Sequence, residues 1–212
     1  MTTTITWDVS IRHFLQQAGS SNPTPGGGSV AALIAALGAS MTSMVGNLTQ
    51  GEKFADIQST IAEVLDKMRR STAECEGLLQ ADSSSFNKYM DALKLPKSSD
   101  EEKRIRKNAL HEATIQAIDV PLRLIEVCRE GLTFTHRIAE SSNKNVISDL
   151  GIGAILFEAA AQSALLTIEI NLASLKDAEL KQLYSDKVAS LMNEIQDLKS
   201  SSLQITRNRI FN

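Results

Sequence analysis

The architecture of this chain follows from one stretch, Pro23-Thr24-Pro25-Gly26-Gly27-Gly28-Ser29, which runs directly into Val30-Ala31-Ala32-Leu33-Ile34-Ala35-Ala36. The prolines hold the entering chain extended, because each fixes its own φ and disfavours helix in the residue before it. The glycines leave backbone N–H groups uncovered, and Ser29 or Gly28 can cap a helix that starts here. Such a start suits an anionic or carbonyl-bearing ligand, and the alternative is a tight structural turn between helices. It matches neither a phosphate-binding Walker loop nor a dinucleotide fingerprint.

The helix that follows is predicted over residues 29–49 and is unusually rich in small side chains. Two rows of small side chains recur every four positions, and they consist of Ala31, Ala35, Ala39 and Ser43 beside Ala32, Ala36 and Ser40. No Asp, Glu, Lys or Arg occurs between Arg12 and Glu52. Small side chains let neighbouring helices approach closely, so we expect this helix in the centre of a bundle. A transmembrane span is the less favoured alternative, because polar and glycine residues interrupt the run.

Helical periodicity continues on both sides of this element. Further helices are predicted over residues 8–18, 54–95, 99–129, 131–141, 150–175 and 177–209. Pro121 falls inside the third of these ranges, 99–129, where it removes a hydrogen bond to the Ala117 carbonyl and is expected to bend the helix. No strand alternation or repeat interrupts the pattern. The sequence therefore predicts an all-α fold, a bundle of five or six helices, several of them long, in a single domain over residues 1–212.

Composition narrows the class of protein. The 212 residues are 42% hydrophobic, 22% charged and only 4% aromatic, with a formal net charge of −3. These values favour a globular helical protein and give no reason to expect nucleic acid as a partner. Two cysteines imply no disulfide framework, and the N-terminal residues lack the basic start and apolar core of a signal peptide. We therefore expect a cytoplasmic protein without a membrane partner.

Asp82 is the clearest candidate for chemistry. On a helical wheel with about 100° per residue it falls within the apolar stripe of its helix, beside Leu79 and Phe86. A carboxylate on the core side is costly unless it is hydrogen-bonded, and its pKa becomes tunable. The alternative is a helix that leaves the core near Ser83, with Asp82 in solvent.

Other polar residues stand where apolar surroundings are expected. Asp149 follows Ser148, a good N-cap for the nearly uncharged helix over 150–175, and Asn171 lies within that helix and needs internal partners. Lys53 stands just past the small-residue helix as a partner for anionic groups. His111 has no cysteine or acid at metal spacing, and no metal site is predicted. The residues alone favour a helical protein that binds a small polar or anionic molecule, with one acid transferring a proton.

The same residues carry a resemblance to a known family. The stretch from Pro23 to Ala32 resembles the opening motif of the formiminotransferase–cyclodeaminase C-terminal domain family, and later landmarks follow in the family's order. These landmarks are Gly51-Glu52-Lys53-Phe54, Asp82 with Phe86, Leu95-Pro96-Lys97, Val120-Pro121-Leu122, Asn143-Lys144-Asn145-Val146-Ile147-Ser148-Asp149 and Ile170-Asn171-Leu172.

The resemblance implies an all-helical homodimer that binds a tetrahydrofolate derivative and needs no cofactor beyond that substrate. Members are similar to formimidoyltetrahydrofolate cyclodeaminases, which expel ammonia, or to methenyltetrahydrofolate cyclohydrolases, in which water opens the methenyl bridge. Carried over residue by residue, it implies Asp82 and Asp149 as catalytic groups. The implied substrate-binding residues are Pro25, Gly26, Gly27, Gly28, Ser29, Lys53, Asn145 and Asn171. The alternative is a non-catalytic helical folate-binding or interaction module.

Overall fold

A computed structural model describes residues 6–212, which form six α-helices and two short 3-10 helices. The elements in chain order are α1 (Ile11–Ala18), α2 (Gly27–Asn47), η1 (Glu52–Ile57), α3 (Gln58–Lys94), α4 (Asp100–Arg137), η2 (Lys144–Val146), α5 (Ile147–Ser174) and α6 (Ala178–Phe211). No strand occurs in the described part of the chain. The all-α prediction is confirmed.

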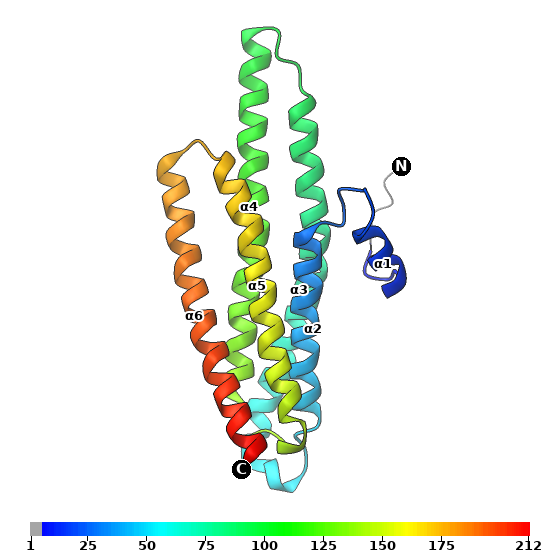
Figure 1. Cartoon of the computed structure of the whole chain (residues 1–212), viewed down its shortest axis with the longest axis vertical. Coiled ribbons are helices and arrows are strands. Elements are labelled where there is room, and N and C mark those ends of the chain that lie inside the picture. The colour runs from blue at the N-terminus through cyan, green and yellow to red at the C-terminus, as the bar shows by residue number, and fades with distance from the viewer. Residues whose placement is uncertain (1–5) are drawn as a thin grey trace.

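Helices α2 to α5 form an up-and-down bundle with α6 added along one side (Figure 1). Helix α2 packs on α3 and α5, α3 packs on α4, and α6 lies against α4 and α5. The hairpin of α3 and α4 extends beyond the end of α2, while short α1 sits beside the bundle. Long helices that follow one another along the chain run antiparallel, so the start of α2 lies near the end of α5.

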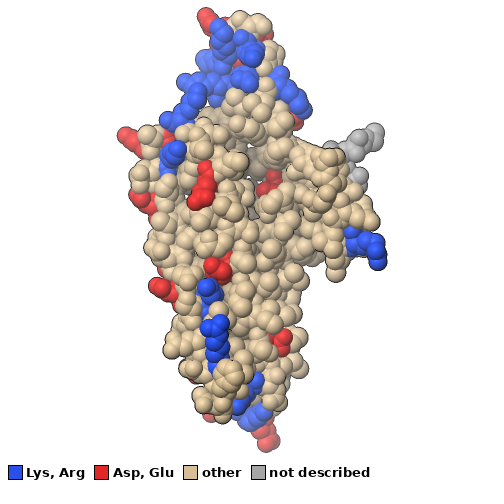
Figure 2. Space-filling view, viewed as in Figure 1, with Lys and Arg blue, Asp and Glu red and all other residues tan. Residues whose placement is uncertain are grey.

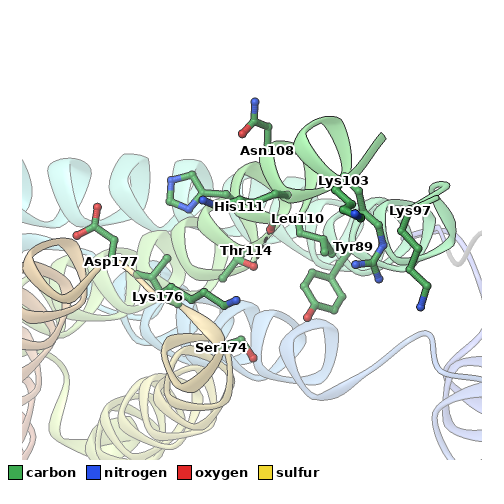
Figure 3. A pocket seen from close by; sticks show the side chains of 13 residues that line it. Tyr89, Lys97, Lys103, Asn108, Leu110, His111, Thr114, Ser174, Lys176 and Asp177 are labelled. Carbon is green, nitrogen blue, oxygen red and sulfur yellow. Dashed lines mark hydrogen bonds between the residues drawn. The ribbon is translucent and has the colours of Figure 1, made fainter. Parts of the chain in front are cut away.

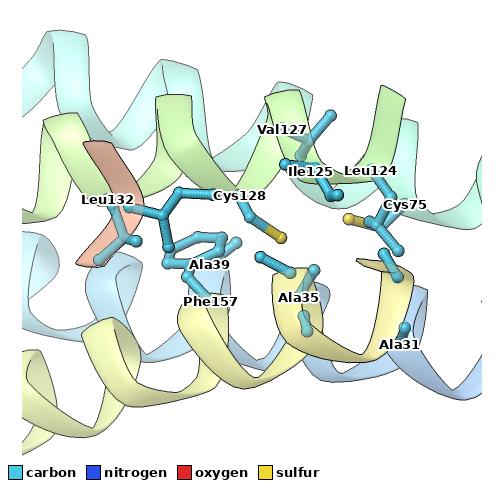
Figure 4. Close-up of a cluster of buried hydrophobic side chains, with 14 of the residues drawn as sticks. Ala31, Ala35, Ala39, Cys75, Leu124, Ile125, Val127, Cys128, Leu132 and Phe157 are labelled. Carbon is cyan, nitrogen blue, oxygen red and sulfur yellow. The ribbon is translucent and has the colours of Figure 1, made fainter. Parts of the chain in front are cut away.

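The small residues of α2 face the centre of the bundle, as predicted. Ala31, Ala35 and Ala39 are completely buried, and Figure 4 shows them in one cluster with Cys128 of α4 and Phe157 of α5. At Gly38, a Cβ atom would lie 3.2 Å from the backbone oxygen of Gly153 and 3.2 Å from the Phe157 ring. The absence of a side chain at Gly38 therefore lets α2 and α5 pack closely.

Helix boundaries differ from the sequence prediction at several places, and the ends of α1 and α4 are two of them. Helix α1 begins at Ile11, where the Ser10 hydroxyl accepts a hydrogen bond from the His13 amide, and not at residue 8. Helix α4 continues through Pro121 and Gly131 to Arg137, so the predicted break after residue 129 is wrong. A Cβ atom at Gly131 would lie 2.4 Å from Phe157 Cζ, so this glycine makes room for an aromatic ring and does not end the helix.

Within residues 6–212, two helices are long and apolar enough to cross a membrane by length and composition, Gly27–Asn47 and Lys144–Ser174. In their most apolar windows, 56% and 44% of the residues are buried inside the bundle. Their outward sides keep exposed apolar residues, which are Leu37, Ile152, Ile155, Leu166 and Ile170. We call these five residues the apolar face.

Charge is unevenly distributed over the molecule. Lysine and arginine side chains gather at the tip of the α3–α4 hairpin, whereas the middle of the face shown in Figure 2 carries few charges. The molecule is hollowed just below this basic tip. The hollow lies at the end of the bundle where α2 begins.

Candidate functional site

The glycine-rich loop leads into α2 at least two residues earlier than the capping prediction requires. Helix α2 starts at Gly27, and Gly26 is its N-cap without a side-chain hydrogen bond. The Thr24–Pro25 peptide bond is cis, and Pro25 is buried. The prediction that Ser29 or Gly28 caps the helix is wrong, because both residues lie in its first turn, where Ser29 turns towards α3.

Asp82 lies on α3 directly opposite that first turn. Its Oδ2 atom accepts a hydrogen bond from the Ser29 backbone amide at 2.9 Å and another from the Ser29 hydroxyl at 2.8 Å. Burial raises the pKa of the Asp82 carboxyl, and the two Ser29 hydrogen bonds oppose that rise. The helical wheel placed Asp82 on the inward side of α3, and the structure agrees.

Gly28 is the residue that lets the carboxyl approach so closely. A Cβ atom at position 28 would lie 2.1 Å from Asp82 Oδ1 and 2.6 Å from its Cγ. Any side chain here must therefore displace the carboxyl group. The glycine triplet thus serves the approach of a side chain from α3, in addition to exposing backbone at the start of α2.

A cavity of about 350 Å³ opens beside this contact. We call it the acid cavity. It is lined by Gly26, Gly27, Gly28, Asp82 and Asn171 of the predicted site, and also by Phe86, Tyr89, Val120 and Pro121. Ser29 is completely buried and does not line the acid cavity, so it can affect a ligand there only by holding Asp82 in place. The volume of the acid cavity lies within the range of about 300–1,000 Å³ typical of small-molecule sites.

Asn171 supplies a hydrogen bond that the backbone of the neighbouring helix α4 lacks. Because Pro121 has no N–H, the Ala117 carbonyl loses its usual partner in α4. The Asn171 side-chain amide donates to that carbonyl at 3.2 Å and to the Thr167 carbonyl at 2.7 Å. The amide therefore has the internal partners that the sequence required. Its Oδ1 atom forms no hydrogen bond within residues 6–212 and is free to accept one from a ligand.

Three predicted site residues lie at the opposite end of the bundle. Lys53 belongs to η1, after the end of α2, and its ammonium group lies 4.7 Å from the centre of the Phe54 ring. Asn145 lies in η2 and Asp149 in the first turn of α5. The 21 residues of α2 separate this end from Asp82 by about 30 Å. Within one chain, Lys53, Asn145 and Asp149 do not converge with Asp82.

A larger cavity adjoins the first, and the sequence prediction did not include it. This basic cavity, of about 780 Å³, lies between the α3–α4 hairpin and the turn from α5 to α6 (Figure 3). Its charged lining consists of Lys97, Lys103, Arg106, Lys107, Lys176 and Asp177. Tyr89 and Ser174 line both cavities, which makes them neighbours. The density of lysine and arginine over residues 97–107 was the available sequence signal.

The arrangement of these residues is suited to proton transfer to a bound small molecule. Burial raises the pKa of the Asp82 carboxyl above its ordinary value, which suits this group to proton transfer, and the two cavities beside it have room for a small molecule. No group of three or more His, Cys, Asp or Glu side chains suited to a metal ion occurs in residues 6–212. Fold and site together define a helical-bundle protein with an enzyme-like acid site.

Comparison with known proteins narrows this class. The sequence profile of the formiminotransferase-cyclodeaminase family matches residues 10–190. The methenyltetrahydrofolate cyclohydrolase of Methylorubrum extorquens is 35% identical over 202 residues, covering 95% of this chain and 97% of that protein. The formimidoyltransferase-cyclodeaminase of Mus musculus is 35% identical over 188 residues, covering 88% of this chain but only 35% of its own. The chain belongs to the formiminotransferase-cyclodeaminase family.

The fold agrees with a solved structure. The formiminotetrahydrofolate cyclodeaminase of Thermotoga maritima superposes with a TM-score of 0.87 at 24% identity, covering 96% of this chain and 98% of that one. The chain thus spans nearly the full length of one relative with cyclohydrolase activity and about a third of the bifunctional relatives. The relatives are cyclohydrolase and cyclodeaminase enzymes, and the family resemblance seen in the sequence is confirmed.

Proposed function

We propose that this chain is a folate-dependent one-carbon enzyme that acts at the formimino or methenyl carbon of tetrahydrofolate, as a formimidoyltetrahydrofolate cyclodeaminase or a methenyltetrahydrofolate cyclohydrolase. The observation that carries this proposal is the Asp82 carboxyl group, whose pKa is raised and which lines a cavity at the start of α2. The named activities of the similar proteins supply the substrate class.

Asp82 is the proposed general acid and base. In the cyclodeaminase direction, N10 attacks the formimino carbon and loses its proton, and the resulting tetrahedral carbon loses ammonia after its amino group gains a proton. In the cyclohydrolase direction, a water molecule loses a proton as it adds to the methenyl carbon. One carbon–nitrogen bond then breaks as the leaving nitrogen takes up a proton and the new hydroxyl group loses its own, which leaves a formyl group. Both reactions pass protons between groups bonded to the same carbon, which a single carboxyl of raised pKa can serve. Neither reaction requires a metal or redox cofactor.

The remaining site residues have proposed roles that follow from their positions. Gly26, Gly27 and Gly28 offer backbone at the cavity wall, and Asn171 offers Oδ1. Ser29 holds the carboxyl group, and Pro25 supports the loop behind it. We propose that the chain is a single domain over residues 1–212 and acts in the cytoplasm.

We further propose that the protein acts as a homodimer through the apolar face of α2 and α5. An exposed patch of this kind on a soluble protein is suited to a second copy of the chain. If two copies pack with their α2 helices antiparallel, the end carrying Lys53, Asn145 and Asp149 in one copy approaches the Asp82 end of the other. Those three residues then contribute to the partner's site, which explains why they are far from Asp82 within one chain.

An absorbance assay tests the function directly. Formation of the methenyl chromophore from a formimino substrate supports cyclodeaminase activity, and loss of methenyltetrahydrofolate faster than its spontaneous hydrolysis supports cyclohydrolase activity. Absence of both, together with folate binding measured by calorimetry, assigns the chain to the non-catalytic folate-binding class. Absence of turnover and of binding contradicts a folate role altogether.

A further inference from the structure

We propose that Arg209, near the end of α6, is a positioning residue for Asn145 and Asp149. It holds the α4–α5 connection, residues 138–146, which carries Asn145 and leads into the first turn of α5, where Asp149 lies. Figure 1 shows the end of α6 at the end of the bundle where α2 ends. The inference rests on the proposed function, in which Asn145 and Asp149 contribute to the partner's site.

The Arg209 guanidinium group joins two backbone carbonyl groups of this connection. Its Nη1 atom donates to the Ala139 carbonyl oxygen at 2.5 Å, and its Nη2 atom donates to the Ser142 carbonyl oxygen at 2.6 Å. Both of these residues are buried. Within residues 6–212, no other group donates to either oxygen. Carbonyl groups just past the end of a helix have no partner within it, so Arg209 supplies hydrogen bonds that these two would otherwise lack.

A guanidinium group suits this contact better than an ammonium group. Its N–H donors are fixed in one plane and belong to separate nitrogen atoms, so they can reach carbonyls of two different residues at once. A lysine side chain ends in a single nitrogen and cannot reproduce a contact made by two. Because the two carbonyls lie three residues apart, the contact fixes the shape of the turn between Ala139 and Ser142 as well as its distance from α6.

The end of α2 holds the same connection from its other side. The Asn143 side-chain amide donates to the Leu48 carbonyl at 2.8 Å, and the Asn143 backbone amide donates to the Thr49 hydroxyl at 3.0 Å. The Asn143 side-chain oxygen accepts a hydrogen bond from the Asn145 backbone amide at 3.2 Å. The backbone at Asn145 is therefore fixed relative to α2 directly and relative to α6 through the turn that Arg209 holds.

Helix α6 also lies directly against the first two turns of α5. A Cβ atom at Gly151 would lie 2.9 Å from Cγ2 of Thr206, which is buried. Gly151 follows Asp149 by two residues, so the two positions are about 200° apart around the helix, and Asp149 faces away from α6. Asn145 is exposed and Asp149 is half-buried. The last turns of α6 thus support the backbone and leave both side chains accessible to a second subunit.

Mixed dimers allow Arg209 to be changed in one chain at a time. In a dimer of one Asp82→Asn chain and one Asp149→Asn chain, the site with both acids takes Asp149 from the Asp82→Asn chain. Arg209→Ala added to that chain should lower the restored activity about tenfold, because Asp149 loses its alignment. Arg209→Ala added to the Asp149→Asn chain should change the restored activity less than about twofold, because the acid it would misplace is already inactive.

This comparison separates positioning from general damage to the fold. An equal loss from either chain, or no loss from either, overturns the inference. An inactive mixture of the two acid variants, when the wild-type protein is active, also overturns it, because Asp149 then has no partner site to serve. Arg209→Lys in the Asp82→Asn chain should keep more activity than Arg209→Ala, since one carbonyl can still be satisfied.

Arg207→Ala is the matched control for Arg209→Ala. Arg207 lies two residues earlier on α6, is exposed, and forms no hydrogen bond or ion pair with any residue that the structure describes. Its replacement removes the same charge from the same helix and should leave the restored activity unchanged in either chain. A loss as large as that of Arg209→Ala would attribute the effect to charge and overturn the inference.

Hydrogen exchange makes the test independent of turnover. In Arg209→Ala, the backbone amides of residues 143–153 should exchange about tenfold faster than in the wild-type protein, whereas those of residues 31–39 in α2 should not change. Arg207→Ala should alter neither set. Unchanged exchange over residues 143–153, or faster exchange in both sets, overturns the inference. A wild-type protein without activity contradicts the proposed function instead, and the exchange rates still decide whether Arg209 holds this segment.

Discussion

Ser29 donates two hydrogen bonds to a single oxygen of Asp82, one from its backbone amide at 2.9 Å and one from its hydroxyl at 2.8 Å. The contact joins residues that are 53 positions apart and fixes the first turn of α2 against the middle of α3. The other carboxyl oxygen points at Gly28 and fills the space that a side chain would occupy there. The position of the proposed catalytic carboxyl group is therefore determined by two consecutive residues of the glycine-rich stretch.

Gly28→Ala is expected to displace the Asp82 carboxyl group. The added Cβ would overlap Oδ1, so the carboxyl must move, and a displacement of about 1 Å can lower kcat by about a hundredfold. The strain should also reduce the free energy of unfolding by about 1–3 kcal/mol. Gly77→Ala is the matched control, because a Cβ atom at that exposed position of α3 meets nothing within 4 Å. The control should keep full activity and gain up to about 1 kcal/mol. Equal activity of the two variants would contradict a steric role for Gly28.

Asp82→Asn is expected to abolish turnover while folate binding and Tm stay nearly unchanged, because the amide oxygen can still accept from Ser29. A large loss of stability would instead mark Asp82 as structural. The variant also changes the dependence of stability on pH. The folded-state pKa of Asp82 is raised above the ordinary 3.8, so the folded chain retains this proton to a higher pH than the unfolded chain. The free energy of unfolding therefore falls as pH rises from about 3.8 through the folded-state pKa. Denaturant titrations across this window should show that fall in the wild-type protein and its absence in Asp82→Asn.

Asn171 and Pro121 are expected to be energetically coupled. Asn171→Leu leaves the Ala117 carbonyl without a partner and should cost about 1–3 kcal/mol of stability. Pro121→Ala supplies the missing backbone N–H, so Asn171→Leu should cost at least about 1 kcal/mol less in that background. A double-mutant cycle measured by chemical denaturation gives the coupling free energy. Additive effects would show that the Asn171 amide does not serve this carbonyl.

The apolar face is expected to hold the dimer together. Leu37 and Ile155 are 48% and 46% exposed, and Leu37→Glu/Ile155→Glu places two charges on that face. Light scattering should give the mass of a dimer for the wild-type protein and of a monomer for the variant. Leu183→Glu, at a 65% exposed position on α6, is the control and should remain dimeric. A monomeric wild-type protein contradicts the proposed assembly.

Mixing two inactive variants tests whether Asp149 serves the partner's site. If it does, a mixed dimer of Asp82→Asn and Asp149→Asn chains has one site with both acids intact. Random exchange makes half of the dimers mixed, so about a quarter of wild-type activity should return. Full inactivity of the mixture after verified subunit exchange would confine both acids to one chain, where they lie at opposite ends of α2.

The sequence predicted the helices of the fold better than the contacts between residues that lie far apart in the chain. The rows of alanine on α2 and the place of Asp82 on the inward side of α3 follow from helical periodicity alone. Helix α4 was predicted to run through Pro121, but its continuation past Gly131 was not, because glycine is a poor helix former and only the close approach of the Phe157 ring explains this residue. The separation of Lys53 from Asp82 could have been predicted from the sequence, because the long helix α2 lies between Lys53 and Ser29, the residue that binds Asp82. The basic cavity could not have been predicted, because it forms only where the α3–α4 hairpin and the end of α5 lie side by side in the folded chain.

The Ser29–Asp82 contact also selects one alignment of α2 among several similar ones. The alanines of α2 repeat every four positions, so sliding this helix by four residues, about 6 Å, would bring one alanine into the place of another. The alanine rows alone therefore do not distinguish such alignments. Gly38 does so, because a side chain in its place would meet the Phe157 ring, and the hydrogen bonds from Ser29 to Asp82 are also lost in every shifted alignment. The residue proposed to transfer the proton thus also helps to select the native alignment. A descendant of this protein that lost its activity would still have reason to keep an acceptor at position 82.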